Sequence, residues 1–299
     1  MKTLTVFTPA YNRAHTLHRC YESLCRQSNF DFVWLIIDDG STDNTEVLVK
    51  EWMRKENAFE IRYHKQQNQG MHGAHNSAYR LIDTELNVCI DSDDCMTDDA
   101  IEKILSFWAK NGNENVAGII ALDATLEGKL IGDQFPNDLT HTTLSGYYAK
   151  GGKGDKKLIY RTDIIRKYPE YPLFEGEKYV GLAYKYLLCD QEYTLLTMNE
   201  VVCLVEYQYD GSSATMFQQY FRYPRGFAFL RTVNMQYEAT AKRRFIEAVH
   251  YVSSSLILRN PKFLKETPCK FKTFCAIPFG ILLFMYLSYK RNASYKIQR

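Results

Sequence analysis

Residues 32–43 read FVWLIIDDGSTD, a run of apolar side chains followed at once by two carboxylates and a turn. A run that is apolar at every position, rather than at alternate positions, is typical of a strand buried on both faces of a sheet. Similar runs occupy residues 3–8, 86–90 and 116–122, and the segments between them have helical patterns. This alternation predicts an α/β architecture with a mostly parallel sheet flanked by helices.

The remaining elements follow from the same patterns. We expect a short strand at 60–64 and helices at 14–27, 43–55, 74–81 and 98–110. After Asp123 the alternation weakens, and residues 144–157, which end in KGGKGDKK, predict a mobile loop because they are rich in Gly and Lys. We then expect a helix over 177–188, strands over 193–198 and 201–207, and helices beyond Ser212.

Composition restricts the class of protein. The content of apolar and charged residues is ordinary for a globular chain, so disorder is not expected. The eight cysteines include no CxxC pair, and we expect reduced thiols without a metal-binding or catalytic role. The opening residues, MKTLTVFTPAYNR, contain no sustained apolar segment of a secretory signal, which predicts a cytoplasmic protein.

Polar motifs follow three of the predicted strands: TPAYNR at 8–13, DDGSTD at 38–43 and DSDD at 91–94. Ligands of open parallel sheets bind beyond the carboxyl ends of the strands, so we expect the three motifs to meet at one edge of the sheet. The carboxylates of DSDD could hold a divalent cation that in turn holds a diphosphate. Alternatively, Asp93 and Asp94 could simply cap the next predicted helix.

The DDGSTD motif has a similar pair of explanations. Gly40, Ser41 and Asp43 suit a turn and the start of a helix, with no ligand required. That explanation does not account for Asp38 and Asp39 at the end of an apolar strand. A carboxylate at this position could accept a hydrogen bond from the imide N–H of a base such as uracil.

Four motifs in this order, TPAYNR, WLIIDDGSTD, NQGMHGAHNSA and CIDSDD, resemble the N-terminal half of the family-2 glycosyltransferases with the GT-A fold. The resemblance covers residues 3–125 and continues more weakly to about 226. It implies a Rossmann-like sheet and an inverting transfer of sugar from a nucleotide-sugar donor, with UDP-sugar expected. It also implies a divalent cation, Mn²⁺ or Mg²⁺.

The resemblance also implies roles for individual residues. Asp93 would be the metal ligand, and Asp39 would read the base. The other nucleotide-sugar-binding residues would be Thr8, Pro9, Ala10, Tyr11, Arg13, Asn68, Gly70, His72, Asn76, Asp91 and Ser92. Many family members have Lys where this chain has Met71. For His72 and His75, polar residues in contact with solvent at the start of a helix remain the alternative.

The acceptor half would supply the catalytic base from PLFEGEKYVG, with Glu177 as first candidate and Glu175 as second. Many members have Glu-Asp here, whereas this chain has Glu177 followed by Lys178. The alternative is that both glutamates only favour a helix N-terminus. Residues 209–226 resemble a weaker family segment near the acceptor, and the lysines at 150–157 could fold over a diphosphate or form a basic loop without a ligand.

The C-terminal end is basic and apolar. Residues 259–299 contain nine Lys or Arg and one acid, Glu266, whereas the rest of the chain contains 28 and 34. Residues 274–289 are apolar but short for a span and include Pro278 and Gly280. An in-plane or re-entrant segment at the membrane surface over 270–291 is therefore expected, with a buried core helix as the alternative.

We accordingly expect a GT-A domain over 1–215, made of a nucleotide-sugar-binding half (1–125) and an acceptor half (126–215), and a helical extension over 216–299. The expected function is metal-dependent transfer to a glycan or polyprenyl-linked saccharide in polysaccharide biosynthesis, such as capsule or O-antigen, at the inner face of the membrane. No nucleic-acid partner is expected. The alternatives are a catalytically silent, membrane-docked binding module and a nucleotidyltransferase, although TPAYNR lacks the glycine of a phosphate loop.

Overall fold

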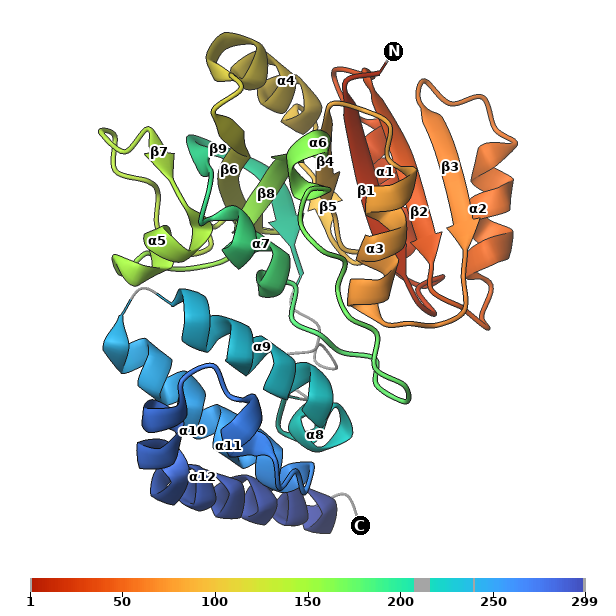
Figure 1. Cartoon of the computed structure of the whole chain (residues 1–299). Helices are drawn as coiled ribbons and strands as arrows, with labels where there is room; N and C mark the ends of the chain where they lie inside the picture. The colour runs from red at the N-terminus through yellow and green to blue at the C-terminus, as the bar shows by residue number, and fades with distance from the viewer. Residues whose placement is uncertain (1, 207–215, 239, 298–299) are drawn as a thin grey trace. The chain divides into compact units, whose positions relative to one another are not determined.

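The computed structural model describes residues 2–206, 216–238 and 240–297 (Figure 1). The chain forms two compact units. The first comprises Met1–Glu170 and Lys185–Glu206, and the second comprises Tyr171–Tyr184 and Tyr207–Arg299. The expected domain boundary at residue 215 and the first part of the 209–226 segment lie outside the described residues.

The first unit is built on one sheet. In the described part of the chain its strands are β1 (Leu4–Ala10), β2 (Phe32–Asp38), β3 (Glu60–Lys65), β4 (Leu86–Cys89), β5 (Cys95–Met96), β6 (Val116–Thr125), β7 (His141–Thr142), β8 (Lys156–Arg161) and β9 (Thr194–Val205). Their order is β3-β2-β1-β4-β8-β6-β9-β5, and β7 pairs with β9. The strands β1 to β4 are mutually parallel, as predicted. Antiparallel pairing begins at β8, which lies between β4 and β6.

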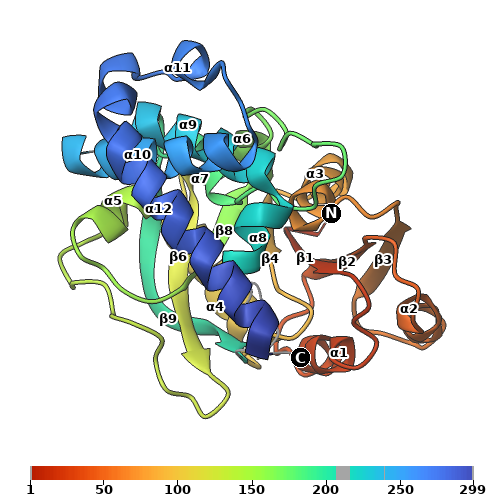
Figure 2. The ribbon, with the colours of Figure 1, turned by 90° about the horizontal axis from the view of Figure 1, so that it is seen from below.

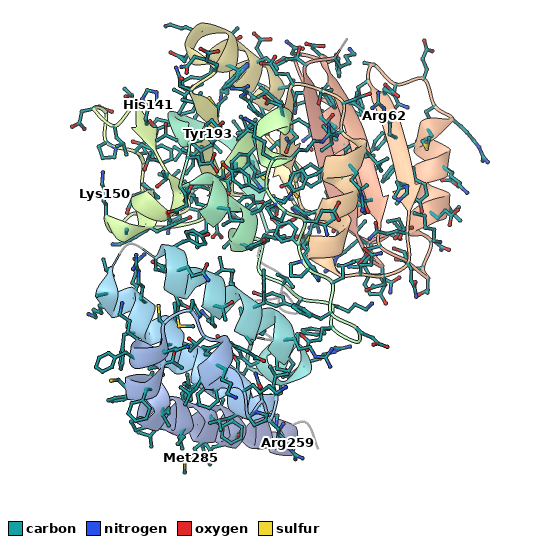
Figure 3. All side chains as sticks on the ribbon, viewed as in Figure 1. Arg62, His141, Lys150, Tyr193, Arg259 and Met285 are labelled. Carbon is teal, nitrogen blue, oxygen red and sulfur yellow. The ribbon has the colours of Figure 1, made fainter. Side chains whose placement is uncertain are left out.

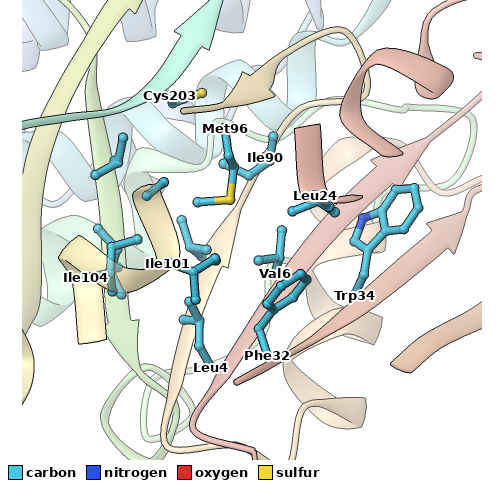
Figure 4. Close-up of a cluster of buried hydrophobic side chains, with 14 of the residues drawn as sticks. Leu4, Val6, Leu24, Phe32, Trp34, Ile90, Met96, Ile101, Ile104 and Cys203 are labelled. Carbon is cyan, nitrogen blue, oxygen red and sulfur yellow. The ribbon is translucent and has the colours of Figure 1, made fainter. Parts of the chain in front are cut away.

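Helices cover both faces of the parallel strands. Those of the first unit are α1 (Leu17–Cys25), α2 (Thr45–Met53), α3 (Met71–Leu81), α4 (Ala100–Asn111), α5 (Leu144–Ala149) and α6 (Thr162–Ile165), and α7 (Ala183–Cys189) contains the division between the units. One hydrophobic cluster joins α1, α2 and α4 to the sheet, with Leu24, Trp34 and Ile104 among its members (Figure 4). On the other face, the ring of Phe7 contacts those of His75 and Tyr79 on α3. Figure 2 shows α3 opposite α1 and α2.

Three predicted elements are wrong. The expected mobile loop at 144–157 contains α5, and its last two lysines begin β8. The two strands expected at 193–207 are one strand, β9, whose register with β6 shifts near Val201. The helix expected over 177–188 begins only at Ala183. Residues 177–182 lie outside any helix, and Gly176, at φ 77°, belongs to the turn before them.

From Met216 onwards, the described residues of the second unit are mostly helical, as predicted for the C-terminal extension. Its helices are α8 (Met216–Arg222), α9 (Pro224–Tyr237), α10 (Ala241–Ile257), α11 (Phe263–Glu266) and α12 (Lys270–Ile297). Helix α10 packs against both α9 and α12. Among the described helices, only the segment Lys270–Arg291 of α12 is long and apolar enough to cross a membrane.

Candidate active site

The loops after β1 and β2 are joined by hydrogen bonds, as expected for strand ends that share one edge of a sheet. Asn12, at φ 54°, accepts a hydrogen bond at Oδ1 from the amide of Thr42 at 2.8 Å. The amide of Asn12 donates to Ser41 Oγ at 2.9 Å, and that of Ala14 donates to Asp43 Oδ2 at 3.1 Å. The TPAYNR and DDGSTD motifs therefore form one continuous surface.

Only part of TPAYNR presents side chains to solvent. Thr8 is buried, and its hydroxyl accepts a hydrogen bond from Trp34 Nε1 at 3.0 Å inside the core. Pro9 and Ala10 are also buried. Tyr11 is 48% exposed and Arg13 is partly exposed. The ring of Tyr11 and the backbone of the strand end are thus the parts available to a ligand.

The two carboxylates that end β2 differ in what they hold. Asp38 is fully buried and accepts hydrogen bonds from the amide of Ser41 and the hydroxyl of Tyr63, so it organises the turn. Asp39 accepts bonds from Gln66 Nε2 and the amide of Gln69, both at 2.8 Å, and from the amide of Gly70 at 2.7 Å. These bonds fix the position of the Asp39 carboxylate at the end of β2.

Asp39 fixes the segment that leads into α3. Gly70, at φ 84°, precedes the first residue of that helix, and the helix begins three residues earlier than expected. A Cβ at Gly40 would lie 2.9 Å from the amide nitrogen of Asn68, so the DDGSTD turn packs closely on this segment. The backbone N–H groups of the first turn of α3 make this end attractive to an anion.

The histidines of α3 are buried: His72 is 1% exposed and His75 is fully buried. The alternative of a solvated helix start is therefore wrong. Asn76 is also buried, at 2% exposed. The ring of His75 packs edge-on against Phe7 and its Nδ1 lies 3.0 Å from the carbonyl of Met71. Burial lowers the pKa of His75 from 6.5 to about 4, because desolvation disfavours the charged ring.

This burial predicts a dependence of stability on pH. The folded protein keeps His75 neutral down to about pH 4, whereas the unfolded chain protonates it near pH 6.5. The stabilisation is complete above pH 6.5 and is lost as the pH falls from 6.5 to 4, by about 2 kcal/mol already at pH 5. Urea unfolding between pH 7 and pH 5 should show this loss in the parent, and His75→Leu should remove it. An identical loss in the variant would contradict the assignment.

The DSDD motif forms a turn at the carboxyl end of β4. The amide of Asp94 donates to the carbonyl of Asp91 at 3.0 Å, and the short strand β5 follows directly. The residue that precedes α4 is Asp99, so the alternative in which Asp93 and Asp94 cap that helix is wrong. Asp91 is exposed, Asp93 is partly exposed and Ser92 is buried.

Electrostatics distinguishes the carboxylates of the turn. Burial, followed by the negative charge of Asp91, raises the pKa of Asp93, and Arg13 acts in the opposite direction. Two carboxylates that disfavour each other's charge and face solvent suit a cation. Within residues 2–206, 216–238 and 240–297, no group of three or more His, Cys, Asp or Glu side chains is arranged to hold a metal.

A buried cluster lies behind the turn. Lys157 Nζ on β8 is 3.8 Å from Asp94 Oδ2, and these side chains are 12% and 6% exposed. Cys203 Sγ on β9 lies 3.8 Å from the same oxygen. Burial raises the pKa of Asp94 to about 7, although Lys157 opposes the rise. Burial opposes the charge of Lys157, but Cys203, Asp123 and Asp94 together raise the pKa of its ammonium well above its usual value.

Sequence reasoning missed Lys157 and Asp123 as members of this cluster. Asp123 is 2% exposed, lies on β6, and its Oδ1 has no hydrogen-bond partner among the described residues. Its position at the end of an apolar run is the same signal that identified Asp38 and Asp91. Lys157 carried only a weak signal, the alternation of KKLIYR, because it follows a glycine-rich segment.

The sequence left two alternatives for the lysines of 150–157, and neither describes the last two of them in this structure. Lys156 is 8% exposed, and its Nζ donates to the carbonyls of Lys153 at 2.9 Å and Ile131 at 3.3 Å. Lys157 faces Asp94. Both ammonium groups are therefore used inside the first unit.

The candidate bases lie in the second unit. Glu177 is 9% exposed, and its two carboxylate oxygens accept hydrogen bonds from the amides of Arg225 at 3.0 Å and Gly226 at 2.9 Å. It therefore caps the N-terminus of α9 rather than that of the helix expected at 177–188. Glu175 is exposed in the preceding turn.

Comparison with known proteins gives a consistent result. Residues 5–159, just over half of the chain, match the model of the family described as Glycosyl transferase family 2. A chondroitin synthase of Escherichia coli is 35% identical over 108 residues, which make up 36% of this chain and 16% of that protein. The match thus covers only a small part of that relative's length.

Two solved structures share the fold. The Staphylococcus aureus TarS fragment 1–349 in complex with UDP-GlcNAc aligns with a TM-score of 0.59 at 14% identity, over 93% of this chain and 80% of the other. The mannosyltransferase PcManGT of Pyrobaculum calidifontis, in complex with GDP-Man and Mn²⁺, aligns with a TM-score of 0.54 at 15% identity, over 95% and 87%. These likenesses confirm the predicted GT-A type of α/β fold. The match of the family model over residues 5–159 establishes that the chain belongs to glycosyl transferase family 2.

Proposed function

We propose that this chain is an inverting glycosyltransferase that uses a UDP-sugar and a divalent cation, Mn²⁺ or Mg²⁺. The observation that carries the proposal is the pair of carboxylates Asp91 and Asp93 in the turn after β4, next to the strand whose end forms the TPAYNR and DDGSTD surface. Two structures of the same fold, with UDP-GlcNAc and with GDP-Man and Mn²⁺, support it.

In this proposal each part of the surface holds one part of the donor. The ring of Tyr11 contacts the base, and the carboxylate of Asp39 reads the imide N–H of the base. The first turn of α3, after Gly70, faces the diphosphate. Asp93 would be the metal ligand, and Asp91 would approach the ribose or the metal shell. When bound, a divalent cation would neutralise charge on the departing diphosphate.

Transfer then requires a proton acceptor. An acceptor hydroxyl attacks the anomeric carbon, the bond from that carbon to the diphosphate oxygen breaks, and the hydroxyl proton passes to a carboxylate. We assign this carboxylate to the segment PLFEGEKYVG, with Glu177 as first candidate and Glu175 as second. The acceptor is a glycan or polyprenyl-linked saccharide of a bacterial polysaccharide, in accord with the chondroitin synthase relative. Residues 270–291 hold the enzyme at the cytoplasmic face of the membrane, and the reaction takes place there.

A donor panel tests the proposal. The protein is incubated with UDP-, GDP- and dTDP-sugars in the presence of Mn²⁺, of Mg²⁺ or of EDTA, and the released nucleoside diphosphate is measured. We expect slow hydrolysis of one UDP-sugar that stops in EDTA, and a thermal shift with UDP that also requires metal. A UDP-induced shift without hydrolysis or transfer would instead indicate a binding module.

The base assignment predicts a difference between two variants. In Glu177→Gln an amide N–H₂ replaces one of the oxygens that accept the amides of Arg225 and Gly226, so we expect a loss of about 1–3 kcal/mol of stability. Glu175→Gln changes an exposed side chain and should leave the urea midpoint unchanged. Unchanged stability in Glu177→Gln would contradict the capping role.

The same two variants locate the base. At a temperature at which both are folded, the variant that has lost the base should transfer sugar about 10²–10⁴ times more slowly and keep its affinity for UDP. We expect this of Glu177→Gln. Loss of transfer in Glu175→Gln alone would move the base to Glu175, and full transfer in both would exclude the segment.

A further inference from the structure

Helix α12 exposes an apolar side to solvent. Phe271 is 80% exposed, Phe274 63%, Leu282 63%, Met285 60% and Tyr289 71%. These residues recur at helical spacing and lie on one side of the helix, which we call the outer face. Figure 3 shows Met285 on the outer side of the helix. Monomeric soluble proteins rarely expose a continuous apolar surface of this kind, so the outer face indicates an interaction site.

The opposite side of α12 is fixed against its own unit. Thr273, Ala276 and Gly280 are buried, and a Cβ at Gly280 would lie 2.5 Å from Val252 Cβ on α10. Thr273 Oγ1 is also hydrogen-bonded to Thr267 Oγ1 at 2.6 Å. This close approach sets the rotation of α12 about its axis, and the outer face is exposed because the helix cannot turn.

Cations flank both ends of the apolar segment. Lys270 and Lys272 lie at its start, and Lys290 and Arg291 at its end. Aromatic residues lie near both ends of the outer face, Phe271 and Phe274 at one and Tyr289 at the other. Cationic groups favour anionic lipid, and aromatic rings favour the level of the headgroups. A second copy of the chain would oppose like charges at both ends, which disfavours a self-interface.

We propose that α12 lies in the plane of an anionic bilayer, with its outer face at the boundary of headgroups and acyl chains. By length alone the segment Lys270–Arg291 could cross the bilayer. A spanning helix would place one cationic end on each side, against the usual excess of cations on the cytoplasmic side. It would also separate α12 from α10, against which it packs. Helix α10 could not accompany α12 into the bilayer, because it carries the ion-paired Glu247 and the charged Arg243 and Arg244.

The inference rests on the proposed function for its purpose, because an enzyme held flat on the membrane meets a lipid-linked acceptor at the surface where that acceptor resides. It goes beyond the proposed function by naming the contacting side chains and the in-plane orientation. Its test needs no sugar transfer.

The first experiment measures binding of the full chain to vesicles by sedimentation. The outer-face variant carries Phe274→Glu, Leu282→Glu and Met285→Glu. The matched control carries Val47→Glu, Met53→Glu and Leu81→Glu, which add the same charge at exposed apolar positions of α2 and α3. With vesicles of phosphatidylglycerol and phosphatidylcholine, we expect the parent and the control to bind, and the outer-face variant to bind at least about tenfold more weakly. Equal binding of the outer-face variant would overturn the proposal.

The second experiment measures depth. Single tryptophans replace Phe271, Leu282 and Tyr289 in turn, since the native Trp34, Trp52 and Trp108 are buried in the core of the first unit. For an in-plane helix, lipids brominated near the headgroup should quench all three new tryptophans better than lipids brominated at the chain end. Strongest quenching of Leu282→Trp by chain-end bromines would show a spanning helix and overturn the in-plane orientation.

Two further measurements separate the possible failures. Sedimentation velocity without lipid should give the same mass for the parent and the outer-face variant, and a dimer lost in that variant would show a self-interface instead. Hydrolysis of the donor sugar is measured on the same samples. Weak vesicle binding of the parent with intact hydrolysis would overturn only the membrane inference, whereas vesicle binding without hydrolysis of any donor would overturn only the proposed function.

Discussion

Asp93→Ala is expected to lower the release of UDP from the donor by about 10²–10³-fold. Asp93 is the partly exposed carboxylate whose pKa is raised by burial and by the charge of Asp91. A bound cation would be attracted to both carboxylates and would offset their mutual repulsion. Without Asp93, the proposed metal keeps only Asp91 and the diphosphate, and charge on the leaving group is poorly neutralised.

The measurement compares the rate of UDP release over a series of Mn²⁺ concentrations. The matched control is Asp98→Ala, which removes a nearby carboxylate that is 64% exposed and paired only with Arg26 at the surface. A second readout is the thermal shift with UDP. In the parent and in Asp98→Ala, this shift should appear only when metal is present. In Asp93→Ala, it should not appear at all. Unchanged turnover of Asp93→Ala would defeat the metal-ligand role.

Lys157→Met is expected to destabilise the fold by about 3–5 kcal/mol, the usual cost of removing one partner of a buried ion pair. Its ammonium lies 3.8 Å from Asp94, and Asp123 also favours its charge. Methionine fills a similar volume, so the loss measures the carboxylates left without a counter-ion rather than a cavity. The free energy of unfolding is obtained from urea curves of equal slope.

Two companion variants make this result specific. Lys157→Met combined with Asp94→Asn should recover part of the loss, since one of the unpaired charges is then absent. Lys110→Met removes an exposed lysine at the end of α4 and should change the stability by no more than about 0.5 kcal/mol. A loss of under about 1 kcal/mol in Lys157→Met would show that the pair contributes little.

The parallel strands could be predicted because their signal is local. The run FVWLII is apolar at every position, and the strand observed there, Phe32–Asp38, is buried throughout. The acids that follow such runs were likewise found at the edge of the sheet where ligands of parallel sheets bind. Helix bounds differed by a few residues where, as at Gly70, a positive φ rather than a side chain starts the helix.

The parts that could not be predicted depend on partners distant in sequence. The buried ammonium of Lys157 is stabilised by the carboxylate of Asp94, which lies 63 residues earlier in the sequence. No sequence pattern around Lys157 indicates this partner. Glu177 caps a helix that begins with Pro224 rather than the helix that follows it. The strand β9 is continuous because a change of register with β6 accommodates Asn199 and Glu200, which interrupt its apolar pattern.

The hydrogen bonds of Asn12 affect how the donor pocket behaves before any ligand arrives. Its side chain accepts the amide of Thr42, and its own amide donates to Ser41, so the loop after β1 cannot move without the loop after β2. Under the proposed function, the two loops are already joined before a donor arrives, so donor binding need not meet the entropic cost of ordering them separately. In hydrogen exchange without UDP, the amides of Asn12 and Thr42 should open together at equal rates, and saturating UDP should slow both to the same extent.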